Sequence, residues 1–338
     1  MRARHGTPTG QRWPTRVAAF GAVLLCTVPL RCALAGDGFD LTVPASSMPD
    51  TPAIAATADT RVNESGIAAY LADWEARVAR VRASQPHWSS PLVTTTGLLE
   101  QRLRFDLAEQ HAGNGANTTV LDGGRGVDLI VSETNEVQIG AIPYYIRSGV
   151  AGTGPKNKGA IEPIEGFNDW PFLRVEQRLA SAPAGAGNYV LTAWVAVQAP
   201  AGTAQLTNEA WVWQPTLAFG KGWGDFDVQG TVGGYIPASR ADIIGYQIVT
   251  NVAFQYHIAP VLWPEVEVNW THYMNGQRDG LNQVYLTGGL VIGRFRLPHG
   301  LGLTVGGGYQ SAVAPAYQAK PLTPSYNHAW LFTTRLNF

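Results

Sequence analysis

Cysteine is missing from almost the whole chain, because Cys26 and Cys32, its only two cysteines, lie within the first 35 residues. Beyond that point the chain has no disulfide, no thiol nucleophile and no cysteine metal site. Charged residues are also scarce, at 14% of the sequence. Apart from Val17 to Leu30, no segment is a long, charge-free apolar run without Gly or Pro, which excludes a second candidate for a membrane-spanning helix.

The first 35 residues have the pattern of a secretory signal peptide. The basic residues Arg2, Arg4, Arg12 and Arg16 precede the apolar run. Ala33-Leu34-Ala35 then supplies small residues at the positions that a signal peptidase requires, so we expect Gly36 to begin the mature chain. An uncleaved anchor is the alternative, although a run of about 14 residues is short for a bilayer.

Removal of this segment makes the protein acidic. Five of the 24 basic residues and none of the 25 acidic residues lie in it, so 19 basic and 25 acidic residues remain, a net charge of −6. Nucleic-acid partners are therefore not expected, because they require basic patches. No cofactor and no metal site is predicted either, since no metal-ligand spacing occurs.

From Leu98 onward the hydrophobic period is two, which predicts β-strands. Leu99, Leu103, Phe105 and Leu107 alternate with Glu100, Arg102, Arg104 and Asp106. Alternation and turn residues predict eleven further strands: Asn117–Val131, Glu136–Ile146, Trp170–Ser181, Asn188–Ala199, Glu209–Gly220, Asp225–Ile236, Gln247–Ile258, Pro264–Met274, Gln283–Phe295, Leu301–Val313 and His328–Phe338.

The last strand is typical of the C-terminal insertion signal of outer-membrane barrels. Its apolar side carries Trp330, Phe332, Leu336 and the terminal Phe338, although Thr334 weakens the row. Counting backward from it, short connections alternate with long ones, as barrels require. The fold class predicted is therefore all-β: a transmembrane antiparallel up-and-down β-barrel of about 12 strands over residues 91–338, in the outer membrane. A soluble Gly-rich β-sandwich is the alternative.

Aromatic residues gather near the predicted strand ends, which favours two interfacial girdles over a sugar-binding face. The candidates are Tyr144, Tyr145, Trp170, Phe172, Trp223, Phe226, Tyr235, Tyr246, Tyr256, Trp263, Tyr273 and Trp330.

Residues before the barrel divide into a flexible leader (36–60), rich in Ala, Pro, Thr and Asp, and an amphipathic helix segment (61–90). From Glu64 to Ser84 one apolar stripe combines Ile67, Tyr70, Leu71, Trp74, Val78 and Val81. Asn63 or Ser65 could cap this helix. We expect a periplasmic helix packed on the base of the barrel; a helix that enters and plugs the lumen is the alternative.

Several stretches resemble a family of Gram-negative outer-membrane proteins named for the MetA pathway of phenol degradation, described as transporters. They are Asn117-Thr-Thr-Val-Leu-Asp-Gly-Gly124, Pro143-Tyr-Tyr145, Gly220-Lys-Gly-Trp-Gly-Asp-Phe-Asp-Val-Gln229, Asn251-Val-Ala-Phe-Gln-Tyr-His257, Trp263-Pro-Glu-Val-Glu-Val-Asn269 and Gly302-Leu-Thr-Val-Gly306. The resemblance implies an outer-membrane barrel for the uptake of small organic compounds. It implies no catalytic residue.

Charged residues on the polar side of the strands are the candidates for lining the lumen. They are Glu100, Arg102, Arg104, Asp106, Arg174, Glu176, Arg178, Glu265, Glu267 and Arg335. Since the first and last strands of a closed barrel are neighbours, Arg335 is expected near the charges of the first strand. The mixed signs allow two interpretations: a wall of crossed ion pairs that braces a narrow lumen, or a polar passage in which arginines guide anionic or aromatic solutes.

The leading functional hypothesis is a channel for small organic solutes. One alternative is an outer-membrane enzyme that acts on lipid, for which His257, His272, His299 and His328 are available, without a nucleophile motif. The other is a barrel with a structural or docking role. Expected partners are outer-membrane lipid, the barrel-assembly machinery and a small organic solute.

Overall fold

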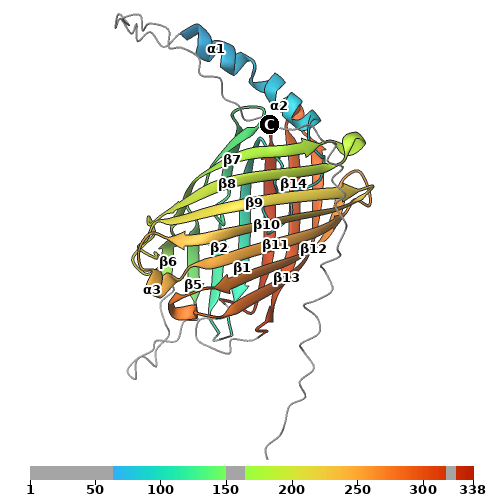
Figure 1. The fold of residues 1–338 in the computed structure, drawn as a ribbon. Coiled ribbons are helices and arrows are strands. Elements are labelled where there is room, and N and C mark those ends of the chain that lie inside the picture. The colour runs from blue at the N-terminus through green and yellow to red at the C-terminus, as the bar shows by residue number, and fades with distance from the viewer. Residues whose placement is uncertain (1–63, 114, 150–163, 317–324) are drawn as a thin grey trace, which may run out of the picture. The chain divides into compact units, whose positions relative to one another are not determined.

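The structure is a computed structural model that describes residues 64–113, 115–149, 164–316 and 325–338. The predicted signal peptide, with Ala33, Ala35 and Gly36 at its cleavage site, and the predicted leader lie outside these residues. Two helices, α1 (Glu64–Ala72) and α2 (Trp74–Ala83), precede a single antiparallel sheet that closes on itself (Figure 1).

Fifteen strand segments make up the sheet. In chain order they are β1 (Arg102–His111), β2 (Asn117–Leu121), β3 (Gly126–Ile130), β4 (Asn135–Ile139), β5 (Tyr144–Ser148), β6 (Ile164–Phe167), β7 (Trp170–Ala182), β8 (Tyr189–Ala199), β9 (Val212–Trp223), β10 (Phe226–Pro237), β11 (Gln247–Tyr256), β12 (Leu262–Tyr273), β13 (Asn282–Arg296), β14 (Gly302–Ala314) and β15 (His328–Asn337). A short helix, α3 (Ala241–Ile244), and three single 3₁₀ turns, η1 (Ala184–Ala186), η2 (Gly276–Arg278) and η3 (Pro298–Gly300), lie in the connections.

The fifteen segments form twelve barrel strands, because three barrel strands are each broken once. β2 and β3 both pair with β1, so they are two halves of one strand. β4 and β5 form the next strand, and β6 and β7 the one after it. Direct pairing of β1 with β15 closes the ring. The prediction of a twelve-stranded antiparallel barrel preceded by an N-terminal helix is thus confirmed.

The three breaks are neighbours, and their backbones are in close contact. The carbonyl oxygen of Gly140 accepts a hydrogen bond from the Trp170 indole N–H at 2.6 Å. A Cβ on Gly140 would lie 2.0 Å from the Pro171 carbonyl oxygen, and one on Gly126 would lie 2.2 Å from the Ile139 carbonyl oxygen. Glycine is thus required where adjacent strands bend together. The predicted continuous strands Asn117–Val131 and Glu136–Ile146 are wrong at these bends.

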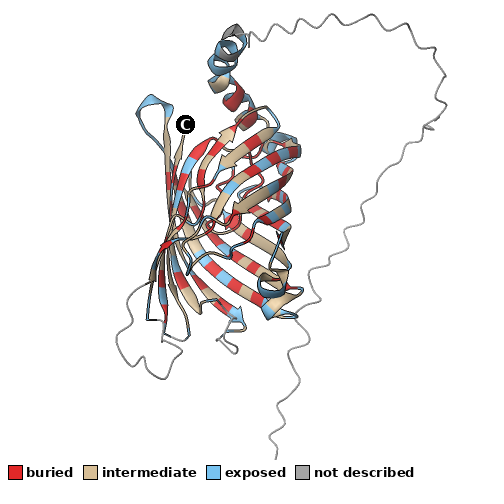
Figure 2. Ribbon diagram, turned by 90° about the vertical axis from the view of Figure 1, so that its left-hand side faces the viewer, coloured by how far each residue is buried: buried red, intermediate tan, exposed pale blue. Residues whose placement is uncertain are grey.

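Strand register sets which side chains face inward. Arg104 pairs with Arg335 across the β1–β15 seam, with Leu103 beside Leu336 and Phe105 beside Thr334. Arg104 and Arg335 are buried, whereas Leu103 and Phe105 are each 46% exposed on the outer face. Figure 2 shows the same alternation of buried and exposed residues along the strands, as the period of two requires.

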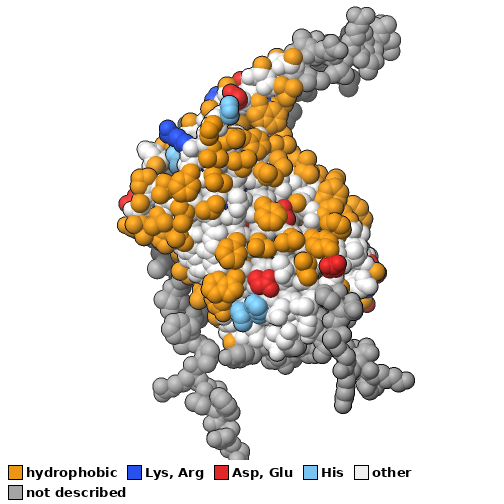
Figure 3. Space-filling model, turned by 180° about the vertical axis from the view of Figure 1, so that it is seen from behind, with side chains coloured by type: hydrophobic (Ala, Val, Ile, Leu, Met, Phe, Trp, Pro, Cys, Tyr) orange, Lys and Arg blue, Asp and Glu red, His pale blue; other side chains and the backbone are white. Residues whose placement is uncertain are grey.

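The outer face of the barrel is apolar. Exposed side chains on it include Leu103, Phe105, Val175, Leu179, Val195, Leu217, Phe219, Val232, Val266, Leu286, Trp330 and Phe332. Hydrophobic side chains gather on the face seen in Figure 3, where charged side chains are few. The predicted insertion-signal residues Trp330 and Phe332 of β15 and the terminal Phe338 after it are exposed, and Leu336 is half-buried. A barrel surrounded by hydrocarbon requires such a surface.

Among the described residues, no helix is both long enough and apolar enough to cross a bilayer.

Aromatic side chains occupy both rims of the outer face. Trp223 and Tyr256 are exposed beside two short turns, and Trp330 is exposed at the other end of its strand. Several of the predicted girdle residues are misplaced, however, among them Tyr235, which shares the strand parity of the buried Asp227 and Gln229. Trp263 and Tyr273 are only 5% and 6% exposed, because their strand parity is that of Glu265 and Glu267, which directs them into the barrel.

Connections alternate in length around the barrel. Short turns (131–134, 224–225, 257–261 and 297–301) alternate with the longer loops, among them 200–211, 238–246 and 274–281. We call these two ends of the barrel the turn end and the loop end. Arg80 of α2 pairs with Glu133 at 2.7 Å, and Arg82 donates to the backbone oxygen of Phe338 at 3.0 Å, which places α2 at the turn end.

Helix α2 packs into the mouth of the barrel. Its Val78 and Val81 form a buried cluster with Leu99 and Ile130. The single helix predicted from Glu64 to Ser84 is instead interrupted between α1 and α2 at Asp73, whose carboxylate pairs with Arg80 at 2.9 Å. Leu99 is also not on the outer face as the period-two pattern predicted, because β1 begins only at Arg102 and Leu99 is fully buried beneath α2.

We expect Gly140→Ala to destabilise the barrel by about 1–3 kcal/mol, since the added methyl group must displace the Pro171 carbonyl. Unfolding in urea, followed by the heat-dependent shift in electrophoretic mobility, measures the change. Gly185→Ala is the matched control, because nothing lies within 4 Å of a Cβ at that exposed position. Equal urea midpoints for the two variants would contradict this explanation of the bend.

Candidate functional site

The lumen contains a loop of the chain itself. Residues 86–98, here called the plug, are neither helix nor strand and connect α2 to the segment before β1. The loop is closed at its neck, where Gln85 Nε2 donates to the Leu99 carbonyl at 2.8 Å and the Leu99 N–H donates to Gln85 Oε1 at 3.1 Å. The plug therefore enters and leaves the barrel at the same end.

Side chains from around the barrel wall hold the plug. On its incoming limb, the carbonyl of Trp88 accepts from Arg294 at 2.6 Å and that of Ser89 accepts from Gln229 at 2.8 Å. On its returning limb, the Thr96 hydroxyl donates to Gln229, and the Gly97 carbonyl accepts from Thr192 at 2.6 Å. The plug is almost wholly buried, with Thr94 at 0% exposure.

Two carboxylates of β12 bind the backbone N–H groups at the tip of the plug, which is formed by Leu92, Val93 and Thr94. The Leu92 N–H donates to Glu265 at 2.8 Å. Glu267 accepts from the N–H of Val93 at 2.8 Å with one oxygen and from that of Thr94 at 2.6 Å with the other. Within the described chain neither carboxylate forms an ion pair with Arg or Lys. Backbone N–H groups bind both carboxylates, and the Gln255 amide also donates to Glu265.

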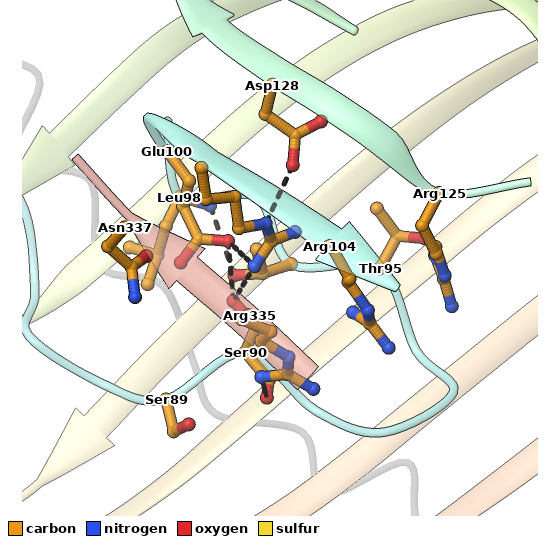
Figure 4. A network of polar contacts seen from close by, with 12 residues as sticks. Ser89, Ser90, Thr95, Leu98, Glu100, Arg104, Arg125, Asp128, Arg335 and Asn337 are labelled. Atoms are coloured by element: carbon orange, nitrogen blue, oxygen red, sulfur yellow. Dashed lines mark hydrogen bonds and ion pairs between the residues drawn. The ribbon is translucent and has the colours of Figure 1, made fainter. Parts of the chain in front are cut away.

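Three guanidinium groups bind the carbonyl oxygens of the same stretch. Arg335 donates to the carbonyls of Ser90 and Pro91, the latter at 2.8 Å, while Arg104 donates to that of Leu92 at 2.5 Å. Arg125 donates to the Val93 carbonyl at 3.0 Å and to the Thr95 hydroxyl at 3.2 Å. In Figure 4 the arginines lie beside the loop that carries Ser90 and Thr95.

We call the wall residues around the tip the socket, with Glu265 and Glu267 as its acidic arm and Arg104, Asp106, Arg125 and Arg335 as its basic arm. The basic arm has more cations than anions. Asp106 accepts from both Arg104 and Arg125 at 2.9 Å and from Thr333 at 2.6 Å. Arg335 is 2% exposed, and no carboxylate among the described residues pairs with it. Hydrogen bonds to charged groups contribute about 1.5–3 kcal/mol each, and a buried charge that loses its partner is costly. The carbonyl groups of the plug thus supply the hydrogen-bond acceptors that the buried guanidinium groups of the wall require.

The tip also fits the wall by shape. Leu92 clusters with Trp263 and Val291, and its methyl groups lie against three glycines of β13 and β14. A Cβ on Gly289 would come within 2.3 Å of Leu92 Cδ1, one on Gly308 within 2.7 Å, and one on Gly306 within 2.9 Å of Leu92 Cδ2. Any larger residue at these positions would fill the niche that Leu92 occupies.

A second charged cluster braces the wall behind the plug. Arg102 pairs with Asp128 at 2.7 Å and also with Glu100, whose carboxylate accepts from Ser90. Arg174 pairs with Glu136 at 2.8 Å, Glu176 at 3.3 Å and Asp128 at 3.5 Å. Arg178 lies apart from this cluster and binds the neck of the plug through Gln85 at 3.2 Å.

All ten charged residues predicted to line the lumen therefore lie in or beside three groups: the acidic arm of the socket (Glu265, Glu267), its basic arm (Arg104, Asp106, Arg335), and the brace with the neck (Glu100, Arg102, Arg174, Glu176, Arg178). Sequence reasoning missed Arg125, Asp128, Glu136, Gln229 and Thr192. Strand parity could have identified Asp128 and Glu136, whereas the Arg125 side chain belongs to an unpredicted bend.

Cavities remain on both sides of the plug. One of about 230 Å³ borders its tip at Leu92 and Val93 and reaches Arg125 and Tyr326; we call it the loop-side cavity. Another of about 360 Å³ borders the ends of the plug at the turn end. There burial and the nearby Arg294 cation lower the pKa of His87. The plug separates these two spaces.

The candidate histidines of a lipid-acting enzyme have other surroundings. His257 stacks on Trp263 with ring centroids 4.6 Å apart, and His328 stacks on His111 at 4.8 Å. His272 contacts the Asn282 side chain at 3.1 Å, and His299 lies in a turn. Within the described part of the chain, no hydrogen bond joins any of these imidazoles to a Ser or Thr hydroxyl.

Comparison with known proteins gives likenesses in fold. No protein-family profile and no curated protein matches the chain. An outer-membrane channel from Pseudomonas putida F1 is 13% identical and covers 74% of this chain and 98% of its own, with a TM-score of 0.44. The NanC porin is 8% identical and covers 69% of this chain and 98% of its own, with a TM-score of 0.43. The KdgM porin is also 8% identical and covers 70% of this chain and 99% of its own, with a TM-score of 0.36. Membership of the MetA-pathway family stays a prediction.

We expect Glu267→Gln to loosen the plug. Glu267 now accepts hydrogen bonds from two backbone N–H groups, and the new amide would place a donor against one of them. Thr94→Cys reports the change, since Thr94 is fully buried, its hydroxyl has no hydrogen-bond partner among the described residues, and removal of the signal peptide would leave no other cysteine. Maleimide labelling of Cys at this position should rise about tenfold in the double variant.

Glu75→Gln, on the exposed side of α2, is the control and should leave the labelling rate unchanged. If Glu267→Gln also left it unchanged while the barrel remained folded, the carboxylate would not be holding the plug.

Proposed function

We propose that this protein is an outer-membrane channel for small organic solutes, seen with its lumen closed by residues 86–98. The observation that carries the proposal is that wall side chains bind the backbone of a removable loop. A lumen of this size that served only as a structural core could be filled by side chains of the wall. Here glycines leave space in the wall, and a separate segment fills it.

The topology of the plug is compatible with its withdrawal. Both limbs leave the barrel at the turn end and are joined at the Gln85–Leu99 neck. The loop can therefore retract as one unit without any part of the chain passing through the barrel. Hydrogen bonds, ion pairs and apolar contacts hold it, so the closed state is an equilibrium state with an energy that mutations or ligands can shift.

The outer-membrane location rests on three features. The outer face is apolar, aromatic side chains mark both rims, and the first 35 residues have the pattern of an exported protein. Export would place α2 in the periplasm, with outer-membrane lipid around the barrel and the barrel-assembly machinery as the partner that inserts it.

An open lumen would present charges of both signs. Arg104, Arg125 and Arg335 lie on one arc of the wall, and Glu265 and Glu267 lie on another. Solutes that carry a dipole or charges of both signs would be oriented between them. The MetA-pathway resemblance favours small organic compounds, and the polar socket favours those with hydrogen-bonding groups. No Ser–His pair among the described residues supports the lipid-acting enzyme.

Replacing residues 86–98 with a four-residue Gly-Ser linker should open the channel. In planar bilayers we expect the native protein to be closed most of the time and the linker variant to carry a steady current. Inserting the same four residues after Gly185, in an exposed turn, is the control and should leave the channel closed. A folded linker variant without current would contradict the proposed function.

A further inference from the structure

The socket around the tip of the plug has the chemistry of a peptide-binding site. It contacts three consecutive N–H groups, those of Leu92, Val93 and Thr94, through carboxylates. It contacts the carbonyls of the first two of these residues through Arg104 and Arg125. Every one of these contacts is made to the backbone, so any peptide in the same conformation could make them.

One side chain of the plug is recognised as well. Leu92 lies in the niche formed by Gly289, Gly306 and Gly308 and closed by Trp263 and Val291. Val93, next in the chain, is only half-buried and borders the loop-side cavity. The socket therefore selects a branched aliphatic side chain at the position of Leu92. At the position of Val93 it can accept side chains of different sizes.

Withdrawal of the plug would leave charges without partners. Glu265 and Glu267 pair with no described cation, and the three backbone N–H donors would depart with the tip, so that Glu265 would keep only the Gln255 amide of the wall. The plug meets these carboxylates with neutral N–H groups. A ligand with an ammonium group at the Leu92 nitrogen would meet Glu265 with a full charge, and charge-assisted contacts are about twice as strong as neutral ones.

The same geometry sets the length of the ligand. A carboxylate that ended the ligand at the Leu92 position would place its second oxygen where the Val93 nitrogen lies, against Glu267. Ending it at Val93 would place that oxygen at the Thr94 nitrogen, again against Glu267. Both endings bring like charges together, so the free carboxylate must come at the third residue or later.

We propose that the unplugged socket binds short peptides of three or more residues with a free amino terminus and a branched aliphatic first side chain, and that such peptides are solutes of this channel. The inference rests on the proposed channel function and names its class of solute. The plug is then a built-in competitor, whose Leu92-Val-Thr94 stretch occupies the site of the peptide. The loop-side cavity, beside the tip, provides the approach from the loop end.

Blockade of single-channel current in the linker variant tests the proposal. The probe is the tripeptide Leu-Val-Thr, compared with Gly-Val-Thr, which lacks the aliphatic side chain, and N-acetyl-Leu-Val-Thr, which lacks the ammonium group. We expect Leu-Val-Thr to block the current at about one-tenth of the concentration needed for either control peptide. Equal blocking concentrations for the three peptides would overturn the proposal.

Two wall variants in the same linker background assign the preference to the socket. Gly289→Ala adds a methyl group where Leu92 Cδ1 now lies, so it should remove the preference for Leu-Val-Thr over Gly-Val-Thr. Glu265→Gln should remove the preference for the free amino terminus. Gly185→Ala, in the exposed turn, should keep both preferences. Preferences that survive in Gly289→Ala and Glu265→Gln would show that the peptides bind elsewhere and would overturn the assignment.

A second measurement does not depend on conduction. In the full-length Thr94→Cys protein, Leu-Val-Thr should displace the plug and raise maleimide labelling about tenfold over Gly-Val-Thr at the same concentration. If the linker variant carries no current, the channel function fails, and labelling alone decides whether the socket binds peptides. If it conducts but the peptides do not differ in either measurement, the channel stands and the peptide proposal fails.

Discussion

Buried charge without a charged partner is the constraint on which this structure depends. Arg335 and the pair Glu265 and Glu267 face the lumen, and in the described chain none of the three forms an ion pair. Desolvating such groups is costly unless hydrogen bonds replace the lost water. The plug supplies those bonds in alternation, with N–H groups toward the carboxylates and carbonyls toward the guanidinium groups. The hydrogen bonds that close the lumen are therefore the same ones that solvate the buried charges of its wall.

The rest of the barrel is adapted to that interaction. Glycines 289, 306 and 308 thin the wall so that Leu92 can seat, and the bend that divides β2 from β3 brings Arg125 to the tip. Behind the plug, the Arg102–Asp128–Arg174 cluster pairs its charges internally, and it contacts the plug through Ser90, whose hydroxyl accepts from Arg102. The wall thus has a part whose charges are paired within the wall and a part whose charges are hydrogen-bonded mainly by the plug backbone.

Sequence alone predicted the architecture because a period of two is imposed on each strand independently. Alternation put Arg104, Glu267 and Arg335 on the inward side and Phe332 on the outward side, and the closing strand pair followed from the order of the chain. The plug was not predictable in this way, since residues 86–98 have no periodicity and their contacts come from strands far away in sequence. Leu99 was misassigned for the same reason: its partner is α2 and not lipid. Inward-facing glycines were the one available sign that another segment approaches the wall.

The central claim is that the plug closes the channel and must move to open it. Cysteines at Gly97 and Ala218 would test this directly. A Cβ on Gly97 would lie 3.2 Å from that of Ala218, so a shift of a few tenths of an ångström brings the pair into the range of about 3.5–4.5 Å found in disulfides. Single-channel recordings of the Gly97→Cys, Ala218→Cys protein should show no openings when it is oxidised, and openings at the native frequency after reduction. Openings of equal frequency in both states would contradict the account.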